Sequence, residues 1–96
     1  MDEQRINRLL EDNQQTLARF IKIEMQTAML YLRLAETETS LRDEKAARRA
    51  RELARLAYDT AVKFLPQVKR LTAEERREIV EQMLVLHDLF EPGSEA

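Results

Sequence analysis

The stretch from Leu17 to Ala35, LARFIKIEMQTAMLYLRLA, constrains the fold of this chain more than any other part of it. At 100° per residue its apolar side chains cover an arc of roughly 260°, whereas an ordinary surface helix presents a much narrower apolar stripe. The remaining side holds a small group of polar residues: Arg19, Lys22, Gln26 and Arg33. A helix of this kind must be covered from more than one direction, so we expect other helices to pack around it.

The composition of the whole chain favours helix. One glycine and two prolines occur among 96 residues, and Ala, Leu, Glu, Arg and Gln are abundant. We predict an all-α fold, an antiparallel three-helix bundle with long helices, in a single domain over residues 1–92 with a disordered tail at 93–96. A domain of this size buries only about 60% of its unfolded surface, so dimerisation into a larger bundle would be a natural supplement.

Three helices are predicted, over residues 3–38, 41–65 and 73–90. The first break falls in residues 37–40, TETS, where Ser40 is a candidate N-cap with Asp43 three residues later. This segment contains neither Gly nor Pro, so a continuous helix from about residue 3 to residue 65, assembled as a coiled coil, is the alternative. We favour the hairpin, because one long helix would leave the wide apolar arc without enough neighbours.

The later boundaries have clearer signals. Pro66 should end or kink the second helix. Thr72 and Glu75 form a capping-box pattern at the start of the third helix, and Pro92 with the following glycine should stop it. The expected buried face of the third helix has helical spacing: Ile79, Met83, Leu86 and Phe90.

The second helix has two contrasting faces. One carries small residues at spacings of three and four, which allow two helix backbones to approach closely, and it should dock on the first helix: Ala47, Ala50, Ala54, Ala57 and Ala61. The other is basic: Arg48, Arg51, Arg55 and Lys63. A solvated face explains it better than a nucleic-acid footprint, because no aromatic residue is interleaved and the formal net charge of the chain is −2.

Isolated polar residues leave alternatives open. Glu24 lies in the apolar arc and, if buried, must be paired or protonated, as a structural ion pair with the second helix or as a functional acid. Asn13 either sets the register of a coiled coil or lies beyond the packed region. His87, the only histidine, is expected to be a helix-flank residue near Asp88 and not a ligand.

No catalytic constellation is present in the sequence. Cysteine is absent, and the serines fall in a predicted turn and in the predicted tail. A second Glu-x-x-His motif, which a carboxylate-bridged di-iron bundle requires, is also missing. We therefore predict no catalytic, cofactor-binding or metal-binding residues, no small-molecule substrate and no enzyme. The alternative is a small all-α mutase of the chorismate type, with Arg19, Lys22 and Glu24 as members of its pocket.

The spacing Tyr31-x2-Leu34-Ala35, followed by Ala54-x3-Tyr58-x2-Ala61-x4-Pro66, resembles the signature of a tetratricopeptide-type hairpin. Here the two halves are separated by about seven more residues than in that repeat. Glu38 replaces its second first-helix aromatic, and no second repeat follows. Longer helices with a single third helix are more similar to the three-helix microtubule-interacting-and-trafficking type of domain. Both resemblances imply a non-catalytic module that docks peptides or helices in grooves between its own helices.

We therefore predict a helical protein–protein interaction or assembly module that self-associates as a homodimer through the apolar arc of its first helix. An amphipathic helix of another protein is the other partner considered, and nucleic-acid binding through the second helix is a weaker alternative. The predicted partner-binding residues lie on the first helix: Ile6, Leu9, Leu10, Ile23, Met25, Met29 and Leu30. The charged N-terminal segment and the interrupted apolar stretches predict a cytoplasmic protein without a membrane span.

Overall fold

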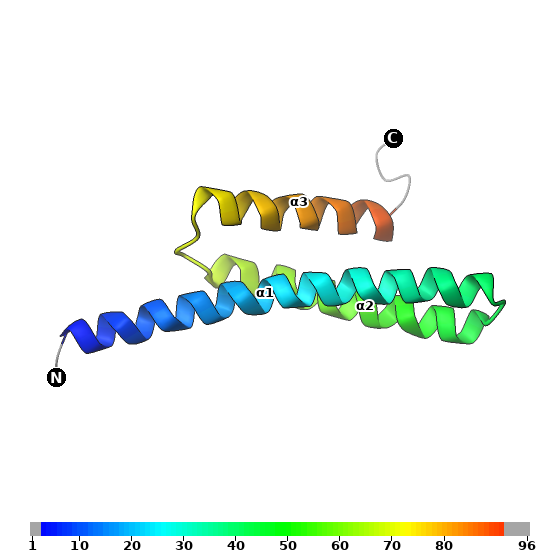
Figure 1. Ribbon diagram of the computed structural model, residues 1–96, viewed down its shortest axis with the longest axis horizontal. Coiled ribbons are helices and arrows are strands. Elements are labelled where there is room, and N and C mark those ends of the chain that lie inside the picture. Colours follow the sequence, from blue (N-terminus) through cyan, green and yellow to red (C-terminus); the bar gives the residue numbers. More distant parts are fainter. Residues whose placement is uncertain (1–2, 92–96) are drawn as a thin grey trace.

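The computed structural model describes the backbone of residues 3–91 and the side chains of Gln4 and residues 13–91. These residues form three α-helices and one 3-10 turn: α1 (Glu3–Ser40), α2 (Glu44–Phe64), η1 (Leu65–Gln67) and α3 (Ala73–Phe90). Figure 1 shows α1 and α2 lying side by side, with α3 packed on the pair. The prediction of an all-α, three-helix fold is confirmed. The predicted stop at Pro92 and the tail at 93–96 lie outside the described residues.

The break between α1 and α2 falls later than predicted. Ser40 is the last residue of α1, and its hydroxyl donates to the Glu36 carbonyl at 3.1 Å, so its prediction as the N-cap of the second helix was wrong. Asp43 caps α2 instead, since its carboxylate accepts the Ala46 N–H at 3.0 Å. Arg42 adopts a positive φ of 63°, which ends α1 and excludes one continuous helix.

Close packing joins α1 to α2. All five alanines of the predicted small face are buried, with exposed fractions of 5% or less. They confirm the prediction that α2 docks through this face, because small side chains let the two backbones approach. The buried face of α1 takes up only part of the apolar arc and consists of Ala18, Ile21, Met25, Ala28 and Ala35.

Two aromatic residues of the apolar arc lie at the margin of the buried face of α1. Tyr31 is half-buried and Phe20 is 36% exposed. The Phe20 ring packs edge-to-face on Phe64 of α2, with 5.8 Å between centroids. The smaller Ile21 and Met25 are fully buried in the core, where close packing leaves less room for an aromatic ring.

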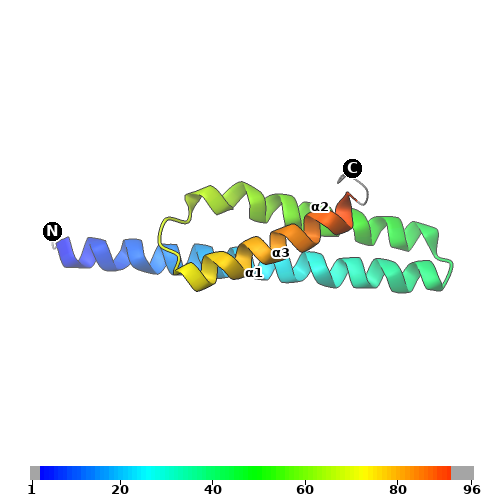
Figure 2. The same ribbon diagram turned by 90° about the horizontal axis from the view of Figure 1, so that it is seen from above.

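The third helix crosses the α1–α2 pair obliquely, beginning over α1 and ending over α2 (Figure 2). At its start Glu75 contacts Lys22 of α1 at 3.4 Å. At its end the Phe90 ring lies 5.3 Å from the Tyr58 ring of α2. Ile79 and Leu86 are fully buried, with Met83 and Phe90 partly buried beside them, which confirms the predicted core face of this helix.

Gln14 of α1 anchors the connection between α2 and α3. Its side-chain amide donates to the Gln67 carbonyl at 3.3 Å, while its carbonyl oxygen accepts the Lys69 N–H at 2.6 Å. Val68, between these two residues, is buried in the core. The direction in which α3 leaves the pair is thus tied to the N-terminal half of α1.

Candidate interaction surface

The side of α1 turned away from the core carries a row of large apolar residues. Phe20, Ile23, Leu30 and Leu34, here called the outer stripe, have exposed fractions of 36%, 50%, 62% and 44%. At 100° per residue their mean direction lies about 150° from that of the buried residues of α1. Single exposed apolar residues are ordinary, but a row along one helix face is typical of an interaction surface.

A groove adjoins the outer stripe, between α1 and α3. It has a volume of about 700 Å³, and each helix contributes four residues at spacings of i, i+3, i+4 and i+7. They are Gln26, Met29, Leu30 and Arg33 of α1 and Glu78, Glu81, Gln82 and Val85 of α3. The groove follows from the oblique crossing in Figure 2, because α3 moves away from α1 as it approaches α2.

The lining of the α1–α3 groove combines apolar and charged side chains. Met29, Leu30 and Val85 supply the apolar part, and Leu30 belongs to the outer stripe as well. Arg33 and Glu81 are among the charged side chains that line it. Amphipathic helices bind in grooves that offer apolar contacts to their apolar face.

The predicted partner-binding residues fall into different environments. Ile23 and Leu30 are exposed on the outer stripe, and Met29 is half-buried in the groove. Met25 has an exposed fraction of 0%, so it is a core residue of the single chain and does not belong to an accessible surface. Its inclusion is corrected here, since packing against α2 and α3 already covers it. The side chains of Ile6, Leu9 and Leu10 lie outside the described ones.

Two members of the outer stripe were absent from the predicted interaction residues. Phe20 and Leu34 were recognised as apolar, but the arc is so wide that its periodicity does not tell which part stays uncovered. The α3 wall of the groove was also missed. Spacings of three, seven and four residues through Phe20, Ile23, Leu30 and Leu34, which fit a heptad pattern, are the signal that could have selected the stripe.

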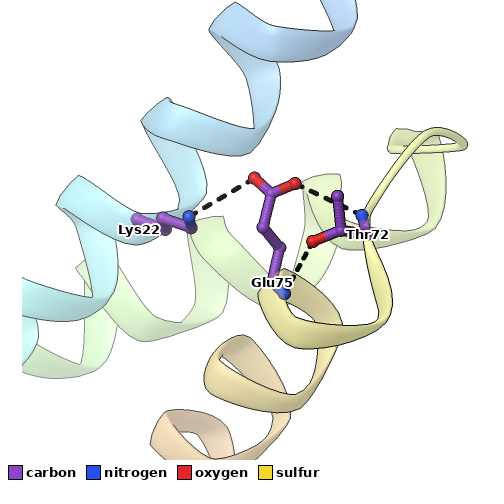
Figure 3. A network of polar contacts seen from close by, with 3 residues as sticks. All are labelled: Lys22, Thr72 and Glu75. Carbon is purple, nitrogen blue, oxygen red and sulfur yellow. Dashed lines mark hydrogen bonds and ion pairs between the residues drawn. The ribbon is translucent and has the colours of Figure 1, made fainter.

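Lys22 and Glu75 join α1 to α3 about one helical turn before the first lining residues of the groove, Gln26 and Glu78 (Figure 3). The Glu75 carboxylate accepts the Thr72 backbone N–H at 3.2 Å and contacts Lys22 Nζ through its other oxygen at 3.4 Å. The Thr72 hydroxyl in turn accepts the Glu75 N–H at 3.0 Å, which completes the predicted capping box. The Thr72 backbone hydrogen bond, followed by the Thr72 side chain and Lys22, holds the pKa of Glu75 below its usual value.

Glu24 is half-buried, and among the described residues it forms no ion pair. The expected pairing with a cation of α2 is therefore not observed. No charged side chain among residues 13–91 is buried, so Glu24 is not the buried carboxylate that the ion-pair interpretation assumed.

The three residues of the mutase alternative do not converge on a hollow. Arg19 is exposed, Lys22 contacts Glu75, and Glu24 is half-buried. None of the three lines the α1–α3 groove or either of two smaller hollows, one beside Thr39 and one beside Val68. Among the side chains that the structure describes, no group of three or more His, Asp and Glu residues is placed to hold a metal ion.

The cations of α2 are partly engaged by acids at the end of α3. Arg55 lies 3.2 Å from Asp59 and 3.8 Å from Glu91, and its guanidinium stands 5.3 Å from the centroid of the Phe90 ring. His87 contacts Glu91 at 3.3 Å and Asp88 at 3.9 Å, in agreement with its expected place on the helix flank. Because Arg55 is engaged by these acids, the basic face of α2 is not a continuous surface of unpaired cations.

None of the helices in residues 3–91 combines the length and the apolar character required to cross a membrane. Comparisons with family models, curated proteins and solved structures found no match to this chain. The likeness to tetratricopeptide-type and microtubule-interacting-and-trafficking domains therefore stays a prediction that rests on the residues quoted for it.

Proposed function

We propose that this chain is a non-catalytic helical assembly module, an antiparallel three-helix unit that self-associates through the outer stripe of α1. One observation carries the proposal: four large apolar side chains lie along one face of α1 with exposed fractions of 36% to 62%, and only Phe20 among them makes a ring contact with α2. Contact between such a row and water is unfavourable. Pairing with a second copy buries the outer stripes of both chains at the same time.

The size of the stripe indicates a reversible complex. Burying the exposed half of a Leu or Ile side chain contributes about 1 kcal/mol. A few such contributions must offset the translational and rotational entropy that two molecules lose on association. We therefore expect the dimer to dissociate on dilution and not to be obligate.

Light scattering over a dilution series tests this function. The wild-type chain should show a mass above that of one chain at high concentration and approach one chain on dilution. A charge inserted by Leu30→Glu should shift the transition by at least about tenfold in concentration, because a carboxylate would be buried at the contact.

Leu56→Glu is the matched control. Leu56 is 64% exposed on α2, against 62% for Leu30, so both variants place a carboxylate where an exposed leucine stood. Only the α1 variant should change the mass. A wild-type mass of one chain at every concentration would contradict self-association.

The α1–α3 groove supports a second candidate, the docking of an amphipathic helix from another protein. Val85 lines this groove but does not belong to the outer stripe, so it separates the two functions. Val85→Glu should reduce the fluorescence of an apolar dye such as anilinonaphthalene sulfonate while leaving the mass of the complex unchanged. Unchanged dye binding would argue against an accessible apolar groove.

A further inference from the structure

The outer stripe of α1 is part of a longer heptad pattern. Between residues 13 and 37, positions on the outer side of α1 follow each other at alternating spacings of three and four: Asn13, Thr16, Phe20, Ile23, Thr27, Leu30, Leu34 and Thr37. In coiled-coil terms residues 13, 20, 27 and 34 occupy a positions, and residues 16, 23, 30 and 37 occupy d positions. The pattern extends over more than three heptads of one uninterrupted helix.

The row of a and d positions between residues 13 and 37 is here called the seam. The charged residues that flank it have opposite signs on its two sides. Arg19 and Arg33 occupy g positions, whereas Glu24 and Glu38 occupy e positions. Both arginines are exposed and both glutamates are half-buried. None of the four side chains takes part in an ion pair within the described residues. Between residues 13 and 38 the charged residues of one border are therefore basic and those of the other acidic, while the remaining flanking positions are uncharged: Leu17, Gln26 and Tyr31.

This charge pattern discriminates between two orientations of a second α1. In a parallel pair a g residue faces the e residue five positions later on the other chain. Arg19 would then face Glu24 of the second copy, and Arg33 would face its Glu38, each contact occurring twice by symmetry. An antiparallel pair would set g against g and e against e, so that basic borders would meet each other and acidic borders would do the same.

We infer that the occupant of the outer stripe is a second copy of this chain, with its α1 parallel to the first and in register. The inference rests on the proposed self-association and adds its orientation and its charge pairs. Of the large apolar residues at these positions, Phe20 contacts Phe64 of α2. Ile23, Leu30 and Leu34 are 44–62% exposed in the single chain, so a second copy reaches them with α2 and α3 in place.

Asn13 agrees with the parallel register. It is exposed in the single chain and lies at an a position, next to Gln14, whose side chain bonds the connection between α2 and α3. In a parallel pair, an Asn at an a position meets its own counterpart, and the two amides can hydrogen-bond to each other. An Asn there specifies register, because any shift leaves it against an apolar residue.

Engineered cysteines test the orientation directly, since the chain has no cysteine of its own. Thr16→Cys, Thr27→Cys and Thr37→Cys are made singly, so that no large apolar residue is lost. Equivalent a or d positions face each other across a parallel axis, within the range that a disulfide spans. All three variants should therefore form covalent dimers on mild oxidation, while Arg48→Cys on the exposed face of α2 should not.

An antiparallel pair gives a different result. Thr16→Cys and Thr37→Cys chains would then fail to cross-link when oxidised separately, because an antiparallel pair sets a positions against d positions. A mixture of Asn13→Cys and Thr37→Cys chains would cross-link instead. That result would overturn the parallel arrangement and leave self-association intact. A wild-type mass of one chain at all concentrations would overturn both.

Charge exchange provides a second readout that does not depend on oxidation. Arg33→Glu and Glu38→Arg, made singly, should each weaken dimerisation by about tenfold, since each converts attractive contacts into repulsive ones. The double variant should restore the dissociation constant to within about threefold of wild type. Arg48→Glu serves as the control for a change of net charge. Failure of the double variant to recover, with the dimer of the wild type intact, would contradict the proposed pairing.

Discussion

Lys22 Nζ lies 3.4 Å from Oε2 of Glu75, and this ion pair joins the middle of α1 to the first turn of α3. Both side chains are about one-third exposed, so the pair itself contributes little free energy of unfolding. Its importance is positional, because the same carboxylate also caps α3 through the Thr72 N–H (Figure 3). The start of α3 is therefore oriented by the helix whose outer side we propose as the interaction surface.

Substitution of Glu75 should change the pH dependence of stability. The pKa of Glu75 is lowered from 4.5, chiefly by the Thr72 backbone hydrogen bond, so its ionised form is favoured in the folded state. Its stabilisation is complete above the unfolded pKa and is lost as the pH falls through the folded pKa. Glu75→Gln should thus lower stability near neutral pH and reduce the loss of stability on acidification.

Urea unfolding at several pH values measures this effect. Glu74→Gln is the control, because Glu74 lies in the same helical turn, is exposed and does not form the capping box. Equal acid sensitivity of the Glu75 variant and wild type would contradict the assigned role of the carboxylate.

Enlarging one alanine of α2 should separate the closely packed helices. Ala54 is fully buried, and Ala54→Leu would introduce three carbon atoms where the two backbones are close. We expect a loss of about 3 kcal/mol in the free energy of unfolding, at the upper end of overpacking costs. Denaturant unfolding measures it, with Glu52→Leu at an exposed site of the same helix as the control. A loss similar to that of the control would mean that the contact tolerates large side chains.

Arg42 should be replaceable by glycine with a gain in stability. Its φ of 63° is unfavourable for a side chain with a Cβ atom, and glycine adopts this conformation freely. Arg42→Gly should raise the free energy of unfolding by about 0.5–1 kcal/mol. Arg49→Gly, inside α2, should instead lower it by about 1 kcal/mol. A destabilised Arg42→Gly variant would show that its side chain contributes more than its backbone costs.

Removal of the Gln14 amide should loosen the connection to α3. Gln14→Ala deletes the hydrogen bonds to the backbone of Gln67 and Lys69, which we expect to cost about 1–2 kcal/mol. Amide hydrogen exchange should show faster exchange in residues 67–72, with α2 unaffected. Gln15→Ala, at the exposed neighbouring position, is the control. Unchanged protection would mean that buried Val68 alone holds the connection.

Several features of this fold could be predicted because they depend on local sequence. The capping box at Thr72 and the apolar face of the third helix were both predicted as observed, since each depends on residues a few positions apart. The alanine face of α2 was identified by its spacing alone. The prediction of Ser40 as an N-cap failed because the helix ends at Arg42 in a left-handed conformation. Glycine is the usual sequence signal for that conformation, and none is present there.

The interaction surface, in contrast, depended on tertiary structure. An arc of roughly 260° on α1 offers several buried faces of similar apolar area, so periodicity alone could not place Met25 inside the core and Leu34 outside it. The packing of the alanine face of α2 and the anchoring of the α3 connection by Gln14 determine which face of α1 is buried. Local sequence determined which residues are helical and apolar, whereas long-range packing determined which apolar residues stay exposed, because only contacts between distant segments distinguish equivalent sides of one helix.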